Sequence, residues 1–278
     1  MAVVTGKSQR WRIAAAHVGL WLLIAVTLFP LLAVVSISLR PGNFATGSLI
    51  PTEISLEHWK LALGFSHTQA DGVVVQPPFP VLLWLWNSIK IATISSLLIV
   101  GVSTTAAYGF ARLRFRFKST ILNSMLLLQM FPVAVALVAI YAIFEAIGGV
   151  IPWLGIETHG GLIVAYIGGV AMHIWTIKGY FETIPTEIEE CAKVDGATSW
   201  QAFYKVLLPL AGPGLVTTGL LAFIGAWNEF LFAVSFTQTP DRRTVPPAIA
   251  NFAGTTGSGF EVPWGSIMAA TVIVTVPI

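Results

Sequence analysis

Charged side chains are scarce in this sequence. Asp, Glu, Lys and Arg together make up 10% of the 278 residues, whereas a soluble domain carries about 25%. This shortage excludes an ordinary water-exposed surface. Hydrophobic residues make up 55%, and a stretch of about 20 of them forms a helix that spans the hydrocarbon core of a bilayer. Long stretches without any Asp, Glu, Lys or Arg occur at 13–39, 91–111, 119–144 and 206–228.

Cysteine is almost absent, and a strong net charge and common catalytic motifs are missing. The single cysteine, Cys191, excludes a disulfide within the chain, and the net charge of +2 does not indicate a nucleic-acid partner. The chain lacks G-x-x-x-x-G-K-[ST], so it is not expected to be an ATPase itself. It also lacks H-E-x-x-H and G-x-S-x-G, which argues against an intramembrane enzyme. We therefore expect no catalytic residue, metal site or cofactor.

Six hydrophobic segments predict an all-α fold, a polytopic membrane helix bundle with about six transmembrane helices. The fourth segment is short. The sixth has 15 residues and ends with the chain. This is less than a full span, so the interpretation that the natural chain continues past Ile278 stays open. The first is too long for a signal peptide, so a retained anchor is expected. The segments are 13–39, 84–111, 119–144, 161–177, 213–236 and 264–278.

The distribution of Lys and Arg predicts the orientation. Ten basic residues fall in the N-terminal tail, in 112–118 and in 178–205, whereas four fall in the connections on the other side. Cytoplasmic loops carry the excess of basic residues, so the N-terminus is expected in the cytoplasm. The loops 43–80, 145–160 and 237–263 then face outward, and the first can hold short structure near Ser55. Several Trp residues lie near segment ends, where the headgroup zone favours them: Trp11, Trp84, Trp86, Trp153 and Trp264.

The stretch 183–213 predicts a cytoplasmic hairpin of two short helices. Pro185 stands before the first helix, Gly196 can take the left-handed conformation that ends it, and Pro209 is expected to stop the second. Two pairs of residues have the spacing of capping boxes, which would start the two helices. These pairs are Thr186 with Glu189, and Thr198 with Gln201.

The predicted hairpin has an apolar side that fits two interpretations. In the first helix Ile188, Cys191 and Ala192 share one face, and the second helix brings several large aromatic residues together. Such a hairpin could lie on the membrane surface or could dock on a cytoplasmic partner. The first helix is net acidic, whereas membrane-surface helices are usually basic, and aromatic residues are frequent interface anchors. Docking is therefore favoured.

The same hairpin resembles the EAA motif of ABC-importer permeases. Glu, Cys and Ala at 190–192, Gly196 and the run V-x-L-P at 206–209 occur at the spacing of the motif. Cys191 replaces the usual Ala and Val206 replaces the usual Ile. Other segments along almost the whole chain, such as HWKLALGF and WTIKGYFETI, resemble the MalG-type permease subunits of maltose/maltodextrin ABC importers.

This resemblance implies a transport subunit of a bacterial inner membrane, with residues 1–278 forming one transmembrane domain. Its partners would be a second permease subunit, two copies of a cytoplasmic ATPase that binds the ATP, and a periplasmic sugar-binding protein. Residues 178–212 would form the ATPase-coupling segment, which sits in a cleft on the ATPase. Within it Glu190 would make a charged contact and Gly196 would permit the turn. The implied coupling residues are Glu190, Ala192, Asp195, Gly196, Ala197, Phe203, Leu208 and Pro209.

The resemblance also implies a role for the periplasmic loop 237–263. In the family this loop reaches into the binding protein and helps to expel the sugar. Without the resemblance, the glycines of its tip fit an ordinary flexible loop equally well. The residues of the tip are Gly254, Thr255, Thr256, Gly257, Ser258 and Gly259.

Several polar residues lie at the predicted depth of the membrane. An ionisable residue there is a functional candidate, and Glu229, next to Asn228, is the strongest. Three interpretations stay open for Glu229, namely a bond to a neighbouring helix, lining of the sugar path, and transfer of a proton. The first is favoured because polar residues commonly join membrane helices. Asn87, Gln129 and His173 lie at similar depth, and His173 has no second metal ligand at helical spacing.

A secondary transporter is the main competing function. Such a protein would need ion-coupling groups and often carries an inverted repeat. One acidic residue at membrane depth and no visible repeat argue against it.

Overall fold

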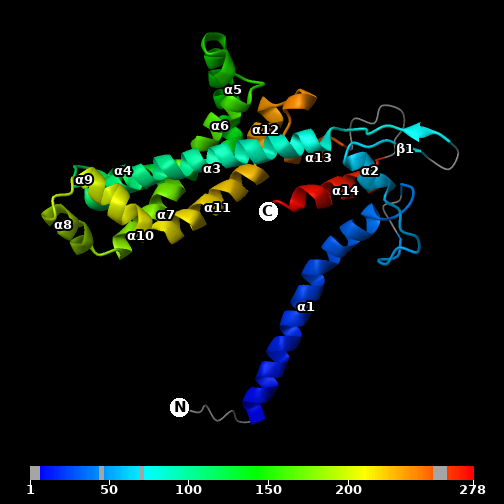
Figure 1. Ribbon diagram of the computed structural model, residues 1–278, viewed down its shortest axis with the longest axis horizontal. Helices are drawn as coiled ribbons and strands as arrows, with labels where there is room; N and C mark the ends of the chain where they lie inside the picture. The colour runs from blue at the N-terminus through cyan, green and yellow to red at the C-terminus, as the bar shows by residue number, and fades with distance from the viewer. Residues whose placement is uncertain (1–6, 44–46, 69–71, 253–261) are drawn as a thin grey trace. The chain divides into compact units, whose positions relative to one another are not determined.

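Helices are the predominant element of the structure. The chain forms two compact units, of which unit 1 comprises Met1–Leu82 and Asn251–Ile278, and unit 2 comprises Leu83–Ala250. Within the described residues, strands occur only as the short pair β1 (His67–Thr68) and β2 (Val74–Val75). The predicted all-α fold is therefore confirmed. The computed structural model (Figure 1) describes residues 7–43, 47–68, 72–252 and 262–278.

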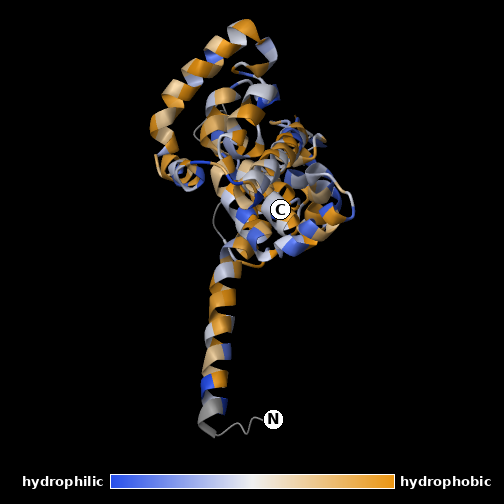
Figure 2. Ribbon diagram, turned by 90° about the vertical axis from the view of Figure 1, so that its left-hand side faces the viewer, coloured by the Kyte–Doolittle hydropathy of each residue, from blue (hydrophilic) through white to orange (hydrophobic). Residues whose placement is uncertain are grey.

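Unit 1 is built on the long helix α1 (Lys7–Ser38), which continues through Pro30. Its ribbon is predominantly hydrophobic along most of its length (Figure 2), and none of its most apolar stretch is buried in the protein. A helix that is apolar on all sides and is not covered by protein suits lipid. Helix α14 (Trp264–Thr275) packs against α1, and α2 (Glu57–Ala62) packs against α14. The short structure predicted near Ser55 is therefore present as α2.

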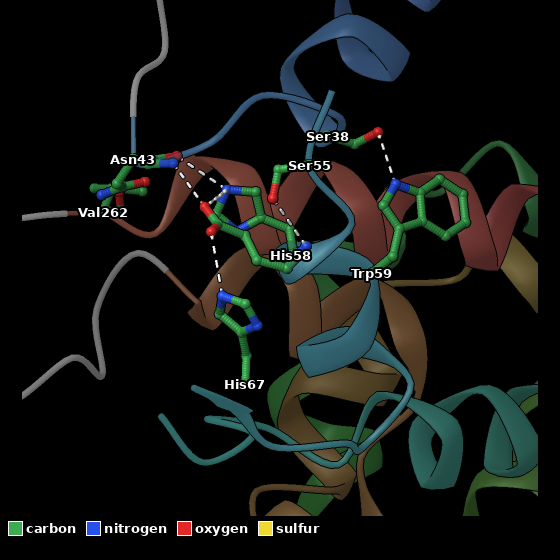
Figure 3. A network of polar contacts seen from close by, with 9 residues as sticks. Ser38, Asn43, Ser55, His58, Trp59, His67 and Val262 are labelled. Atoms are coloured by element: carbon green, nitrogen blue, oxygen red, sulfur yellow. Dashed lines mark hydrogen bonds and ion pairs between the residues drawn. The ribbon is translucent and has the colours of Figure 1, made fainter. Parts of the chain in front are cut away.

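A polar network joins α2 to the segment that follows α1 (Figure 3). The backbone N–H of Gly42 donates to Glu57 Oε1 at 2.6 Å, and His58 Nε2 lies 2.9 Å from the carbonyl oxygen of Gly42. Asn43 Nδ2 donates to the carbonyl oxygen of Val262 at 2.8 Å. Since Val262 stands just before α14, the network ties the first connection of the chain to the start of its last helix.

Gly265, in the first turn of α14, has no room for a side chain. The imidazole ring of His58 lies directly against it, and a Cβ at this position would overlap the ring. Although alanine is a better helix former, we expect Gly265→Ala to destabilise unit 1 by about 2 kcal/mol, because overpacking forces buried neighbours to move. The midpoint of thermal unfolding of the purified protein measures this effect.

Gly101 provides the matched control for Gly265. It also lies in a helix, but a Cβ there would meet nothing within 4 Å. Gly101→Ala should therefore leave the unfolding midpoint unchanged or slightly raised. Equal midpoints for the two variants would contradict the proposed contact between Gly265 and His58.

Three helices are long and apolar enough to cross a membrane unbroken among the described residues. They are α1, α3 (Val81–Arg112) and α5 (Val133–Val150). Two further pairs of helices reach the length of a span only together, and each pair is sharply bent. Helix α14 has 12 residues and is shorter than a span. All six predicted segments thus occur as helices, but several are not straight spans.

The predicted segment 119–144 is interrupted near its middle. Helix α4 (Lys118–Gln129) ends there, and Pro132 stands with an extended backbone at the N-cap of α5. Proline lacks the N–H that a continuous helix needs and its ring clashes with the preceding turn. This single predicted segment is therefore divided into two separate helices. A short 3-10 turn, Pro152–Leu154, follows α5.

The two remaining predicted spans are also broken. Helices α6 (His159–Ile167) and α7 (Val170–Thr183) meet at the two glycines 168–169 with a bend of 50°. Glycine weakens a helix interior because it loses the most backbone entropy on folding. Helix α11 (Gly212–Asn228) is separated from α12 (Leu231–Phe236) by two non-helical residues.

The loop that follows α12 is fastened to the start of α3. Trp84 Nε1 donates to the carbonyl oxygen of Pro240 at 2.7 Å, and Asn87 Nδ2 donates to those of Asp241 and Arg243 at 3.0 Å. Trp84 is 2% exposed and therefore packs inside the protein, and its position in the headgroup zone stays a prediction. Its indole N–H donates to a backbone carbonyl group, and the side-chain amide of Asn87 likewise donates to backbone carbonyl groups.

Part of the predicted outer loop 237–263 is helical. A 3-10 turn covers Pro240–Arg242, and α13 covers Val245–Asn251. The start of α13 is anchored on α3, because the N–H of Val245 donates to Ser88 Oγ at 2.8 Å. The predicted glycine-rich tip of this loop lies outside the described residues.

Candidate functional site

The candidate site is the hairpin that follows α7 (Figure 1). Its first arm is α8 (Thr186–Val194), and its second arm runs from α9 (Ser199–Ala202) through a π-helical turn (Phe203–Leu207) into α10 (Leu208–Leu210). The two short helices predicted for 183–213 are therefore present in the structure.

Gly196 makes the turn between the two arms. Its φ of 91° lies in the left-handed region, which glycine adopts without a steric penalty. The N–H of Gly196 donates to the carbonyl oxygen of Lys193, and the N–H of Ala197 donates to that of Ala192, both at 3.0 Å. These two bonds form a Schellman motif, which satisfies the carbonyl groups at the end of α8.

Only the second of the two predicted capping boxes exists. Thr198 Oγ1 accepts from the N–H of Gln201, and Gln201 Oε1 accepts from the N–H of Thr198. The predicted box of Thr186 and Glu189 is wrong, because Pro185 occupies the N-cap and no side chain caps α8. Glu189 instead turns inward and forms an ion pair described below.

Pro209 does not end the second arm where it stands. The helical path continues to Leu210, and a bend of 75° separates this arm from α11, which begins at Gly212. A π-helical turn lies immediately before Leu208, so the regular i→i−4 hydrogen-bond pattern is already interrupted just before the proline. The arm therefore ends one residue later than predicted.

The second arm is anchored to the helix bundle by apolar packing. Phe203 and Leu207 are buried together with Phe181 of α7 in one cluster, and the ring of Phe203 lies 4.6 Å from that of Tyr108 on α3, centroid to centroid. Phe203, which the family resemblance placed among the coupling residues, is 3% exposed. Its side chain therefore packs inward and holds the hairpin in place.

The first arm presents its apolar side chains to the outside. Ile188 and Val194 are exposed, Cys191 is also exposed, and Ala192 is half-buried. Trp200 at the start of the second arm is 62% exposed and lies beside Phe203, with ring centroids 5.2 Å apart. A surface of this kind suits contact with another molecule.

The predicted coupling residues occupy one continuous segment but differ in exposure. Apart from the inward-facing Phe203, the remaining members are either exposed or half-buried. Exposed members are Glu190, Asp195, Gly196 and Pro209, and half-buried members are Ala192, Ala197 and Leu208.

Sequence reasoning missed the ion pair that joins the hairpin to α3. Arg112, the last residue of α3, donates from Nε to the Glu189 carboxylate and from Nη2 to the carbonyl oxygen of Ile184. The sequence identified Arg112 only as one of several basic residues. No local pattern could link it to Glu189, because the two residues are 77 positions apart.

A cavity of about 630 Å³ lies where the interrupted helices of unit 2 meet. Glu229 lines it and also begins the next helix, because its Oε1 accepts from the N–H of Phe232 at 2.9 Å and its Oε2 accepts from that of Ala233 at 3.0 Å. The carboxylate therefore caps α12 at a break in a membrane helix. Its neighbour Asn228 is exposed and does not line the cavity.

Two other polar residues line the same cavity. Gln129 Nε2 donates to the carbonyl oxygen of Gly169 at 2.9 Å, which joins the end of α4 to the break between α6 and α7. His173 is half-buried in the wall. Within the part of the chain that the structure describes, no three His, Cys, Asp or Glu side chains are arranged to hold a metal ion.

The chain is similar to known membrane transport proteins. The family model for "Binding-protein-dependent transport system inner membrane component" matches residues 77–278. The chain is 54% identical to the "Maltose/maltodextrin transport system permease protein MalG" of Vibrio vulnificus (strain YJ016) and 53% identical to that of Escherichia coli (strain K12). Each alignment covers 100% of this chain and 93% of the relative.

Structural similarity extends the comparison at lower sequence identity. A chain from the crystal structure of a bacterial ABC transporter involved in the import of the acidic polysaccharide alginate has a TM-score of 0.78 at 19% identity. The match covers 99% of this chain and 95% of that one. The two chains therefore share their fold.

Proposed function

Because the chain belongs to the family of binding-protein-dependent transport system inner membrane components, we propose that it is a transmembrane permease subunit of an ATP-driven importer for maltose, maltodextrin or a related oligosaccharide. The sugar class rests on relatives that share more than half of their residues with the chain over its full length and carry the maltose/maltodextrin permease name. Interruptions at prolines and glycines in several of the membrane helices suit a subunit that changes its conformation during transport.

The importer would contain four kinds of subunit. The chain would pair with a second, different permease, and two copies of a cytoplasmic ATPase would bind and hydrolyse the ATP. A periplasmic binding protein would deliver the sugar. The chain itself would need no cofactor, and its N-terminus would lie in the cytoplasm, as the excess of basic residues on that side predicts.

The hairpin of α8, α9 and α10 would couple ATP hydrolysis to transport. The observation that carries this proposal is its outward face, where Ile188, Val194 and Trp200 are exposed while Phe203 fixes the hairpin to the bundle. Closure of the ATPase would move the hairpin as one body, and the attached helices would change the access of the central cavity. On the opposite side of the membrane, the tip 254–259 would contact the binding protein.

A reconstituted complex tests this function. The chain, purified with its partners and placed in proteoliposomes, should hydrolyse ATP faster when sugar-loaded binding protein is added, and it should import the sugar only with ATP. A matched sample without binding protein provides the control. Sugar uptake by the chain alone, driven by an ion gradient, would instead support a secondary transporter.

A further inference from the structure

The first arm of the hairpin buries a single charged residue and no apolar one. In α8 the one buried side chain is Glu189, which is 3% exposed. Ile188 is 39% exposed and Val194 is 86% exposed. An amphipathic helix normally packs through its apolar stripe, but α8 turns that stripe outward and holds the bundle through a carboxylate.

The partner of that carboxylate belongs to the longest helix of unit 2. Arg112 ends α3, its guanidinium forms an ion pair with Glu189, and its Nη2 donates to the carbonyl oxygen of Ile184 at 2.8 Å. Ile184 is the C-cap of α7. One guanidinium group therefore joins the end of α3, the end of α7 and the middle of α8.

Among the residues that the structure describes, neighbouring protein atoms enclose the side chains of this ion pair. The side chains of Arg112 and Glu189 are 10% and 4% exposed. Tyr108, one turn earlier on α3, interacts electrostatically with Glu189 and packs its ring on Phe203 of the second arm. The end of α3 thus holds both arms of the hairpin, the first through charge and the second through an aromatic contact.

We infer that Arg112 and Glu189 are positioning residues that transmit movement of the coupling helix α8 to the membrane helix α3; this inference rests on the proposed function. Separating the pair would leave two desolvated charges without a partner, so the two side chains resist being pulled apart. The planar guanidinium also fixes the direction of its partners in a way that an apolar contact does not. Since Ile99 of α3 lines the large cavity, movement of α3 reaches the cavity wall.

The test removes the charges while it keeps the packing. A double variant, Arg112→Met with Glu189→Leu, replaces the pair by apolar side chains, a change that commonly preserves stability. In the assembled complex the number of ATP molecules hydrolysed per sugar imported should rise about tenfold, because the ATPase still turns over while α3 no longer follows α8. The charge-swapped double variant, Arg112→Glu with Glu189→Arg, should bring the ratio part of the way back to the wild-type value, because it restores the ion pair but not the hydrogen bond from residue 112 to the carbonyl oxygen of Ile184.

Arg114 provides the matched control. It lies two residues beyond Arg112 and is exposed, so Arg114→Met should leave the ratio unchanged. A wild-type ratio in the apolar double variant would overturn the inference, as would loss of assembly in both double variants, which would show a merely structural role. A failure of the proposed function would be seen in the wild-type complex itself, as hydrolysis that does not respond to sugar and binding protein.

Discussion

Replacing Gly196 by proline should abolish ATP-driven sugar uptake by the assembled complex. Proline holds φ at about −65°, whereas residue 196 requires a φ of 91°. The substitution also removes the N–H that donates to Lys193, and it disfavours the backbone of the preceding Asp195, whose ψ of 5° is far from the extended values that a residue before proline prefers. Three effects therefore act against the same turn. Without the turn, the two arms would no longer present a single outward face.

The measurement is uptake of labelled sugar into proteoliposomes, together with the amount of ATPase that copurifies. Gly196→Ala should give an intermediate loss, since a left-handed alanine costs about 1–2 kcal/mol. Gly179→Ala is the control, because Gly179 lies inside α7 where a Cβ meets nothing within 4 Å. Normal uptake by Gly196→Pro would show that the turn has no part in coupling.

Reversing the charge of Glu190 should weaken the association of this subunit with the ATPase. Glu190 is exposed on α8, so the change leaves the fold of the chain intact. The family resemblance implies a charged contact at this position, and placing like charges opposite each other at an interface strongly disfavours association. We expect Glu190→Lys to lower ATP-driven uptake by about tenfold or more, with normal insertion of the subunit into the membrane.

Glu182→Lys is the matched control for this reversal. Glu182 is an exposed carboxylate at the end of α7, and it pairs with Lys178 on the same helix; exposed pairs of this kind contribute little. Its reversal should leave uptake close to that of the wild type. Equal losses in both variants would indicate a general effect of net charge rather than a contact made by Glu190.

The membrane fold and the hairpin could be predicted because each depends on local signals. Long uncharged stretches require helices in lipid. Gly196 determines the turn, and Thr198 with Gln201 determines the second cap, through contacts with residues close in the sequence. The breaks in the spans were harder to predict. Pro132 separates two helices within one predicted segment, and the break after Asn228 depends on Glu229 capping the next helix through its carboxylate.

Long-range contacts account for most of what the sequence did not reveal. Trp84 is buried because Pro240, 156 positions away, accepts its N–H. Glu189 has the spacing of a capping residue, but Arg112 attracts its carboxylate into the bundle. Phe203 shares a motif with exposed residues, yet packing against Tyr108 and its neighbours buries it. In each case the deciding partner lies far away in the sequence, where local patterns carry no information.

Cys191 allows the coupling role of the hairpin to be tested directly. It is the single cysteine of the chain, and it is exposed on α8 beside the proposed contact residue Glu190. A thiol-reactive photo-crosslinker attached there in the intact membrane complex should join this subunit to the ATPase, in an amount that changes when ATP is added. Crosslinks to lipid alone, or labelling of Cys191 by an impermeant reagent from the periplasmic side, would contradict the account.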